Sequence, residues 1–257
     1  MNKIYLADLH IHSALSPCGD EEMTPGKIID VAKQMGLSIL AICDHNSSAN
    51  VEIAMKIAER EGLMLIPGME TECKEEAHIL TLFPDLQKLR IWQAVVDGNM
   101  SGIINDTRRF GSQLIVNEHG EQIGEETRML LGPLKLSAHD VVKLVNDIGG
   151  ICIPAHIDRP AFSLVGQLGF VMKKQGYIAV EVSGRGFAGI AEKKYARVSD
   201  NMNIISNSDA HGIMQLLEGS KTEFYMEKLD FEEFKQALQG LNGRYVVPIK
   251  SLFEENY

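Results

Sequence analysis

Histidines and acidic residues recur along this chain where strands are expected to end. The segment DLHIHS at residues 8–13 follows an apolar, β-favouring run at residues 3–7, which predicts a strand. Residues two apart in a strand face the same side, so we expect His10 and His12 to aim their imidazoles together. Two imidazoles at one point supply half of a metal site. Taken alone, such a pair is more often a hydrogen-bonded core pair, so a metal site needs further ligands from more distant parts of the chain.

Further side chains of the same kinds come after later strand-like runs. In chain order they are Asp44, His45, Glu70, His78, His156, Asp209 and His211. The last two repeat the i, i+2 spacing of the first pair. In α/β barrels the loops after separate strands converge on one face, so we expect these side chains to meet there. Asp44 could orient a ligand imidazole through a hydrogen bond, or could equally be an ordinary strand-end aspartate.

The pattern of elements predicts an α/β fold with a parallel sheet. Strands are expected at 38–43, 63–67, 151–154, 178–182 and 203–205, and helices at 25–35, 49–60, 138–147 and 230–241. Their alternation implies right-handed βα units. Between about 85 and 136 the pattern loosens into helices near 86–96 and 103–110 and a hairpin that joins 114–116 to 122–123. We interpret residues 1–257 as a single domain and 85–136 as an inserted cap.

The composition disfavours several kinds of partner and cellular location. The chain has 257 residues, 45% of them hydrophobic, and a formal charge of −10, which argues against a long nucleic acid as partner. Its four cysteines, Cys18, Cys43, Cys73 and Cys152, have no CxxC spacing, and we expect them to be buried thiols in a reducing compartment. No apolar run approaches the roughly 18 residues of a membrane span, and no export signal is recognised. A cytoplasmic location is the resulting expectation.

Five motifs in order resemble the PHP (polymerase and histidinol phosphatase) family. They are DLHIHS, CDHN, PGME followed by HILTLF, PAHID and SDAH, and the resemblance spans about residues 4–215. It implies a distorted (β/α)7 TIM-like barrel, the PHP fold, and a metal centre, usually trinuclear, that hydrolyses phosphate esters. It also implies a small phosphorylated metabolite as substrate, because related capped members cleave nucleoside monophosphates or bisphosphates.

The resemblance assigns ligands to three metal ions. It places His10, His12 and Asp209 on one ion, and Glu70 as a bridge to a second that His78 and His156 complete. His45 and His211 match ligands of a third ion. That ion also takes an aspartate from the first loop, which reads HSALSPCGDEEMTP and is about three residues longer than usual; Asp20 is the best match.

The chemistry of this donor set favours particular metals. Six imidazoles and three carboxylates suit two to three divalent ions of Zn, Mn or Fe better than Mg or Ca, which prefer oxygen ligands. A metal-bridging hydroxide would be the nucleophile, with Asp209 and His211 as the catalytic residues. The candidates to bind the phosphate are Arg159, Arg185 and Arg128, because one guanidinium group can donate hydrogen bonds to two phosphate oxygens at once. His119 and His139 are expected to be solvated, His139 more firmly than His119.

Three alternatives remain open from the sequence. A histidinol-phosphate phosphatase would share the barrel and the metals. An amidohydrolase acting on a C–N bond would use a related metal barrel. A non-catalytic metal-binding module is the third, although the nearly complete ligand set argues against it.

Overall fold

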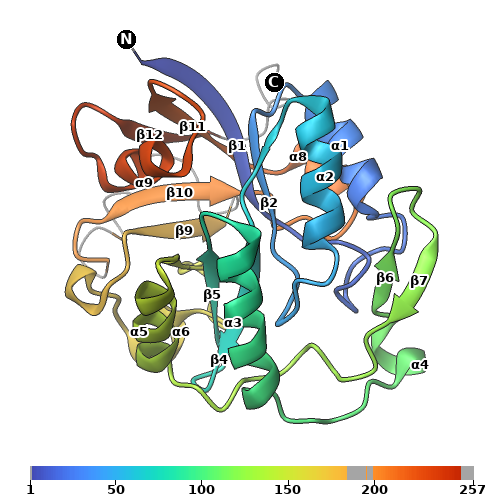
Figure 1. Ribbon diagram of the computed structural model, residues 1–257. Coiled ribbons are helices and arrows are strands. Elements are labelled where there is room, and N and C mark those ends of the chain that lie inside the picture. Colours follow the sequence, from blue (N-terminus) through green and yellow to red (C-terminus); the bar gives the residue numbers. More distant parts are fainter. Residues whose placement is uncertain (1, 184–194, 196–198, 250–257) are drawn as a thin grey trace.

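The computed structural model describes residues 2–183, 195 and 199–249 of the chain (Figure 1). Strands and helices alternate at first, three strands then follow in succession, and a long irregular stretch comes after residue 99. In chain order the elements are β1 (Lys3–Ile11), α1 (Pro25–Gln34), β2 (Ile39–Ile42), α2 (Val51–Glu61), β3 (Met64–Leu65), β4 (Gly68–Cys73), β5 (Ala77–Leu82), α3 (Leu86–Asn99), α4 (Thr107–Phe110), β6 (Leu114–Val116), β7 (Gln122–Glu125), α5 (Ala138–Ile148), β8 (Ile151–Pro154), α6 (Leu164–Leu168), η1 (Lys173–Gln175), β9 (Ala179–Ser183), β10 (Asn203–Asn207), α8 (Ile213–Glu218), β11 (Lys221–Met226), α9 (Phe231–Gln239) and β12 (Tyr245–Ile249).

The predicted helices begin and end where their capping residues stand. Thr24 caps α1 by accepting a hydrogen bond from the amide of Lys27, with proline in the first turn. Gly62 ends α2 with φ 75°, a left-handed conformation that glycine adopts without strain. Ser137 and Asp140 form a capping box at the start of α5.

The first sheet mixes parallel and antiparallel strands, in the order β12-β11-β1-β2-β3. β1, β2 and β3 are parallel, as the βα pattern predicts, whereas β11 pairs antiparallel with β1 and β12. β2 is buried on both faces. Ile39 and Ala41 join a cluster with residues of β5, β8 and β10, while Leu40 and Ile42 pack with residues of α1 and α2. The continuous apolar run of this strand is explained by that double burial.

The expectation of parallel strands is wrong for β4, β5 and β8, which pair antiparallel. The reason is the short connection between β4 and β5. It holds only the residues between Cys73 and Ala77, enough for a hairpin but far too few for the crossover that parallel strands need. As a consequence Glu70 lies within β4 and His78 near the start of β5, not in loops after strands.

The hydrogen-bonded strands do not close into a barrel within the described ranges. Contacts between neighbouring strands run from β1 through β2, β4, β5, β8, β9 and β10 and back to β1. Ladder pairing is interrupted between β2 and β4, between β8 and β9, and between β10 and β1, so the strands fall into separate sheets. The fold is therefore mixed α/β, and the distorted (β/α)7 barrel that the resemblance implies is not confirmed.

The stretch at 85–136 contains the predicted long helix, α3, and the predicted hairpin, β6–β7. Of the helix expected near 103–110, only the four residues of α4 are helical. The hairpin and α4 lie to one side of α2 and α3 (Figure 1). No helix among the described residues is both long and apolar enough to cross a membrane.

Candidate metal centre

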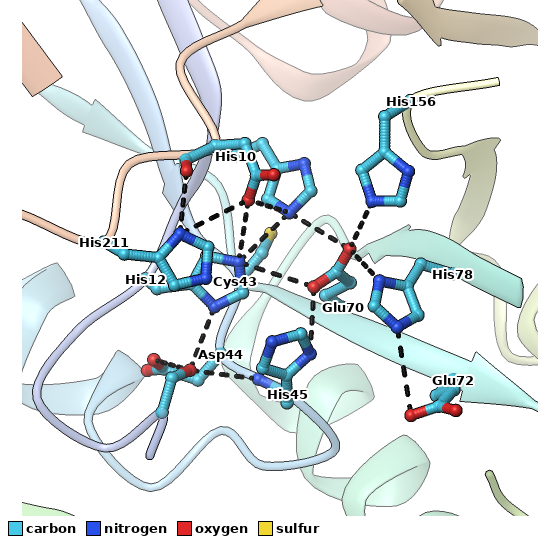
Figure 2. Close-up of polar contacts among 12 residues, drawn as sticks. His10, His12, Cys43, Asp44, His45, Glu70, Glu72, His78, His156 and His211 are labelled. Atoms are coloured by element: carbon cyan, nitrogen blue, oxygen red, sulfur yellow. Dashed lines mark hydrogen bonds and ion pairs between the residues drawn. The ribbon is translucent and has the colours of Figure 1, made fainter. Parts of the chain in front are cut away.

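The carboxylate of Glu70 lies at the centre of a buried histidine cluster (Figure 2). Its Oε1 atom is 3.2 Å from Nε2 of His10, 2.8 Å from Nδ1 of His78 and 3.3 Å from Nε2 of His156. These three imidazoles come from β1, from β5 and from the turn after β8. One carboxylate oxygen therefore contacts nitrogen atoms from two strands and from the turn after a third.

The second oxygen of Glu70 faces the other side of the cluster. Oε2 is 3.4 Å from Nε2 of His12 and 3.0 Å from Nδ1 of His45. An isolated parallel bridge between His45 and Glu70 fixes the two backbones side by side. Each oxygen thus has its own set of imidazoles, which is the arrangement of a carboxylate that can bridge two cations.

Asp209 contacts the first two histidines of the cluster, His10 and His12. Its Oδ1 atom lies 3.3 Å from Nε2 of His10 and 3.2 Å from Nε2 of His12, and these two nitrogens are 3.2 Å apart. The i, i+2 spacing therefore does bring both imidazoles to one point. His211 stacks on the ring of His12, with centroids 4.1 Å apart. Asp209 has φ 50°, an uncommon conformation for a residue other than glycine.

Buried polar side chains outside the cluster fix the orientation of its imidazoles. Glu181 accepts a hydrogen bond from Nδ1 of His10 at 3.0 Å and another from the backbone amide of His156. Such a partner fixes the tautomer of the ring, leaving Nε2 of His10 free for a ligand. The sequence motifs did not include Glu181. Its signal was an acidic residue inside the otherwise apolar run of β9, which buries it completely.

Asp44 acts on the cluster through serine hydroxyls. It accepts hydrogen bonds from the hydroxyls of Ser13 and Ser16 at 2.6 and 2.7 Å, and Ser16 Oγ lies 2.9 Å from Nδ1 of His12. The orienting role proposed for Asp44 thus reaches a ligand imidazole through Ser16 and not by direct contact.

The charges in the cluster shift several pKa values. Burial opposes a charge on His10, but the carboxylates of Glu181, Asp209 and Glu70 outweigh it and raise the pKa of that ring well above its usual value. Burial and the neighbouring imidazoles lower the pKa of His12 well below its usual value. Neutral imidazole is the form that binds metals, so protons and cations compete for these nitrogens.

The carboxyl group of Glu70 is held in its charged form. Burial would raise its pKa, yet His78, His10 and His45 outweigh burial and lower the pKa well below the usual range. A buried anion needs compensating positive charge, which protonated imidazoles or divalent cations can supply.

The donor set fits divalent cations. Among the residues that the structure describes, three groups have ligand atoms within 4.8 Å of one another: His12, His45 and His211; His10, His12 and Glu70; His45, Glu70 and His78. Among the described side chains, Oε2 of Glu70 and the Nδ1 atoms of His45 and His78 are buried and lie at ion-pair distances within the cluster, but they make no well-directed hydrogen bond. Buried polar atoms without hydrogen bonds are costly, and coordination to a cation would satisfy them.

Asp20 and the three candidate arginines differ in where they lie relative to the cluster. Asp20 is exposed and belongs to none of the three groups, so its assignment as a ligand is not supported. Arg128 pairs with Glu126 and Asp97 at 2.7 and 3.0 Å, which uses its guanidinium away from the cluster. Arg159 does reach the site, with Nη2 2.7 Å from Oδ2 of Asp209. Arg185 lies outside the described residues.

His119 and the cysteines complete the comparison with the sequence. His119 is exposed on the β6–β7 turn and does not face the cluster. Cys43, Cys73 and Cys152 are buried as expected, but Cys18 is exposed. Partial desolvation opposes ionisation of the Cys18 thiol, yet the nearby imidazoles of His211 and His45 outweigh it and lower the pKa of the thiol to about 7.

Comparisons with known proteins identify a domain family that the chain matches. The PHP domain model matches residues 8–169. Over 96% of its length the chain is 27% identical to the uncharacterized protein YqxK of Bacillus subtilis (strain 168), and it covers 65% of that protein. A shorter match, 30% identical over 82 residues, covers 30% of this chain and 30% of the phosphoribosyl 1,2-cyclic phosphate 1,2-diphosphodiesterase of Eggerthella lenta.

The fold is similar to that of a solved nuclease. The lesion-specific endonuclease PfuEndoQ from Pyrococcus furiosus superposes with a TM-score of 0.70 at 23% identity, covering 95% of this chain and 58% of that one. The chain therefore spans less than two thirds of the length of both the Bacillus relative and the endonuclease.

Proposed function

The chain belongs to the PHP domain family, and on that basis we propose that it is a metal-dependent phosphoesterase. The observation on which this rests is Glu70, whose two oxygens face separate sets of imidazoles beside Asp209. Two to three divalent ions of Zn, Mn or Fe would be held by these side chains, and they would supply Lewis acidity and an activated water. The protein's own contribution is to position the ligands and the substrate.

Arg159 is the group best placed to bind a phosphate. It already contacts Asp209, and its side chain is 43% exposed, so it can turn between that carboxylate and a ligand. Its planar fork of N–H donors matches two phosphate oxygens. Arg159 would orient the ester and stabilise the charge that develops on its oxygens.

We favour a small phosphorylated metabolite, a nucleoside monophosphate or bisphosphate, as the substrate. Phe162 stacks on the ring of His78, with centroids 5.1 Å apart, and it is 49% exposed. An exposed aromatic face beside the cluster can stack a nucleobase. The formal charge of −10 disfavours a long polyanion.

The segment 85–136 would act as a cap within a single domain of distorted (β/α)7 type. The amide of Asn46, next to His45, donates to the carbonyls of Leu130 and Gly132 at 2.9 and 3.1 Å. Glu72, near His78, accepts from the Gly132 amide at 2.9 Å. A cap tied to the rim of the site would restrict it to small substrates.

A second candidate is a nuclease, because the endonuclease with the same fold acts on DNA lesions. The two are separated by one experiment on metal-loaded chain. Inorganic phosphate release is measured from nucleoside mono- and bisphosphates, sugar phosphates and histidinol phosphate, alongside cleavage of lesion-containing and intact oligonucleotides. Turnover of mononucleotides without oligonucleotide cleavage supports the proposal. Oligonucleotide cleavage alone would establish the nuclease, and histidinol phosphate alone the phosphatase alternative.

Asp209→Asn serves as the negative control in that assay. We expect it to abolish activity while the circular dichroism spectrum stays that of the parent. Persistent activity in this variant would show that Asp209 has no part in the reaction.

A further inference from the structure

Asn46 directly follows the candidate ligand His45 and has a left-handed backbone conformation. Its φ is 48°, which asparagine adopts more readily than most other residues. The backbone amide of Asn46 donates to the carbonyl of Glu70 at 3.0 Å. Its side chain is only 1% exposed, so the amide group at its end needs partners inside the protein.

The side-chain oxygen of Asn46 extends the contact between the segment after β2 and strand β4. Its Oδ1 atom accepts a hydrogen bond from the backbone amide of Glu72 at 3.1 Å. Together with the isolated bridge between His45 and Glu70, this bond holds the two ligand-bearing segments side by side. Asn46 therefore helps to fix the position of His45 relative to Glu70, whose Oε2 atom lies 3.0 Å from Nδ1 of the ring.

The side-chain nitrogen of Asn46 binds a distant part of the chain. Its Nδ2 atom donates to the carbonyls of Leu130 and Gly132 at 2.9 and 3.1 Å. Glu72 adds to this connection, because its Oε2 atom accepts from the amide of Gly132 and its backbone carbonyl accepts from the amide of Leu134, both at 2.9 Å. One buried amide group thus connects the segments that carry two candidate ligands with residues 130–134 of the cap.

We propose that Asn46 is a positioning residue that couples the metal centre to the cap. This inference rests on the proposed function, since it needs cations bound by His45 and Glu70. A bound cation would restrain the backbones of these two ligands, and the hydrogen bonds of Asn46 would extend that restraint to residues 130–134. Such coupling is reciprocal, so a cap held in place would also favour the ligand spacing that the cation needs.

The coupling makes an expectation that direct coordination does not. Among the described residues, the three groups with metal-site spacing contain no member of the segment 85–136. Any ordering of residues 130–134 by a cation must therefore pass through other side chains, and Asn46 contacts both sides.

The test is amide hydrogen exchange of the full chain, measured by mass spectrometry with and without saturating zinc. The amides of Gly132 and Leu134 report on the cap, because both donate to Glu72. In the parent we expect zinc to slow exchange of the peptide that contains them at least about tenfold. Asn46→Gly permits the left-handed backbone but removes the side chain. In this variant we expect zinc to bind, as competition with a chromogenic chelator measures, but to slow exchange in the cap less than about twofold.

Asn242→Gly is the matched control. Asn242 also has a positive φ, 53°, but it is exposed in the turn after α9, and its side chain donates to Gln236. This variant should keep the parental protection of the cap by zinc. A purely structural effect of a substitution would change exchange with and without zinc alike, so the ratio of the two rates isolates the coupling.

Asn46→Asp separates the two halves of the side chain. One carboxylate oxygen can still accept from the amide of Glu72, but the other faces the carbonyls of Leu130 and Gly132 and has no proton to donate. We expect zinc to protect the amides of β4 in this variant as in the parent and to lose its effect on the cap. The same variant decides the question if Asn46→Gly fails to fold.

The outcomes separate this inference from the proposed function. If zinc binds to the parent without slowing exchange in the cap, the coupling does not exist although the metal centre stands. If Asn46→Gly or Asn46→Asp keeps the parental protection of the cap, the coupling does not pass through Asn46. If the parent binds no zinc at all, the metal centre itself is refuted.

Discussion

The carboxylate of Glu181 receives Nδ1 of His10 at 3.0 Å, and this hydrogen bond leaves the opposite nitrogen of the ring facing Glu70 and Asp209. Both partners are completely buried, so the orientation of the ring depends on this contact and not on solvent. A carboxylate behind a ligand histidine fixes its tautomer and makes it a better donor.

Replacing Glu181 by Gln removes that charge while keeping the shape of the side chain. We expect zinc affinity to fall by about 10–100-fold, the usual loss for such a partner. Competition with a chromogenic chelator measures it. Glu232→Gln, an exposed acid on α9, is the matched control and should bind zinc like the parent. An unchanged affinity in the Glu181 variant would show that the hydrogen bond has no influence on the centre.

Replacing Arg159 tests phosphate binding separately from metal binding. Arg159→Met should lower kcat/KM for the best phosphate ester by about 10²–10³-fold, because a donor to the developing negative charge is lost. Bound metal should stay at the parental level, since the ligands are untouched. Arg60→Met removes an exposed arginine paired with Glu118 and serves as control. Equal kinetics in both variants would exclude Arg159 from the substrate site.

Phe162 tests the preference for a nucleobase. Phe162→Ala should raise KM for a nucleoside monophosphate by about tenfold, given the usual strength of base stacking, and leave KM for ribose 5-phosphate unchanged. Phe162→Tyr keeps an aromatic ring and should behave like the parent. If the alanine variant loses affinity equally for both substrates, Phe162 has a general structural role at the site and does not recognise a base.

Lys221 stabilises the strand that places the first two histidines. Its Nζ is 3.1 Å from Oδ2 of Asp8 and donates to two backbone carbonyls, and both charged side chains are 0% exposed. Lys221→Met would leave the buried carboxylate of Asp8 without its positively charged partner. We therefore expect it to lower the free energy of unfolding by about 3–5 kcal/mol.

Urea unfolding at constant m-value measures this loss. The matched control is Lys228→Met, an exposed lysine paired with Asp230, which should leave stability nearly unchanged. The double variant Lys221→Met, Asp8→Leu should recover part of the loss because no lone charge remains. Similar stability for Lys221→Met and the control would mean that the buried pair makes no net contribution.

Local chemistry made much of the fold predictable. Thr24, Gly62 and Ser137 mark helix boundaries through their own hydrogen bonds or backbone freedom, so their signal is contained in a few neighbouring residues. The antiparallel pairing of β4 and β5 was harder to predict from the sequence. Strand direction depends on the length of the connection, and the boundaries of that connection were uncertain. β11 and β12 were missed, since β11 begins with the polar run Lys-Thr-Glu and Pro248 interrupts the apolar run of β12.

The candidate centre was predictable where residue type and spacing coincide. His10, His12 and Asp209 meet as expected because a period of two has one geometric meaning in an extended chain. The first loop is irregular and carries three neighbouring acids, so counting positions gave Asp20 only as the best match among Asp20, Glu21 and Glu22. The folded loop leaves the Asp20 side chain exposed.

The central claim is that Glu70 binds metal ions together with the surrounding histidines. The most direct measurement is the metal content, by elemental analysis, of the full chain supplied with Zn, Mn and Fe and purified without chelators, compared with Glu70→Gln and with Glu59→Gln as an exposed control. We predict about two to three ions per chain in the parent and control, and fewer than about one in Glu70→Gln. A parent chain without bound metal, or a Glu70→Gln variant that holds as much as the parent, would contradict the account.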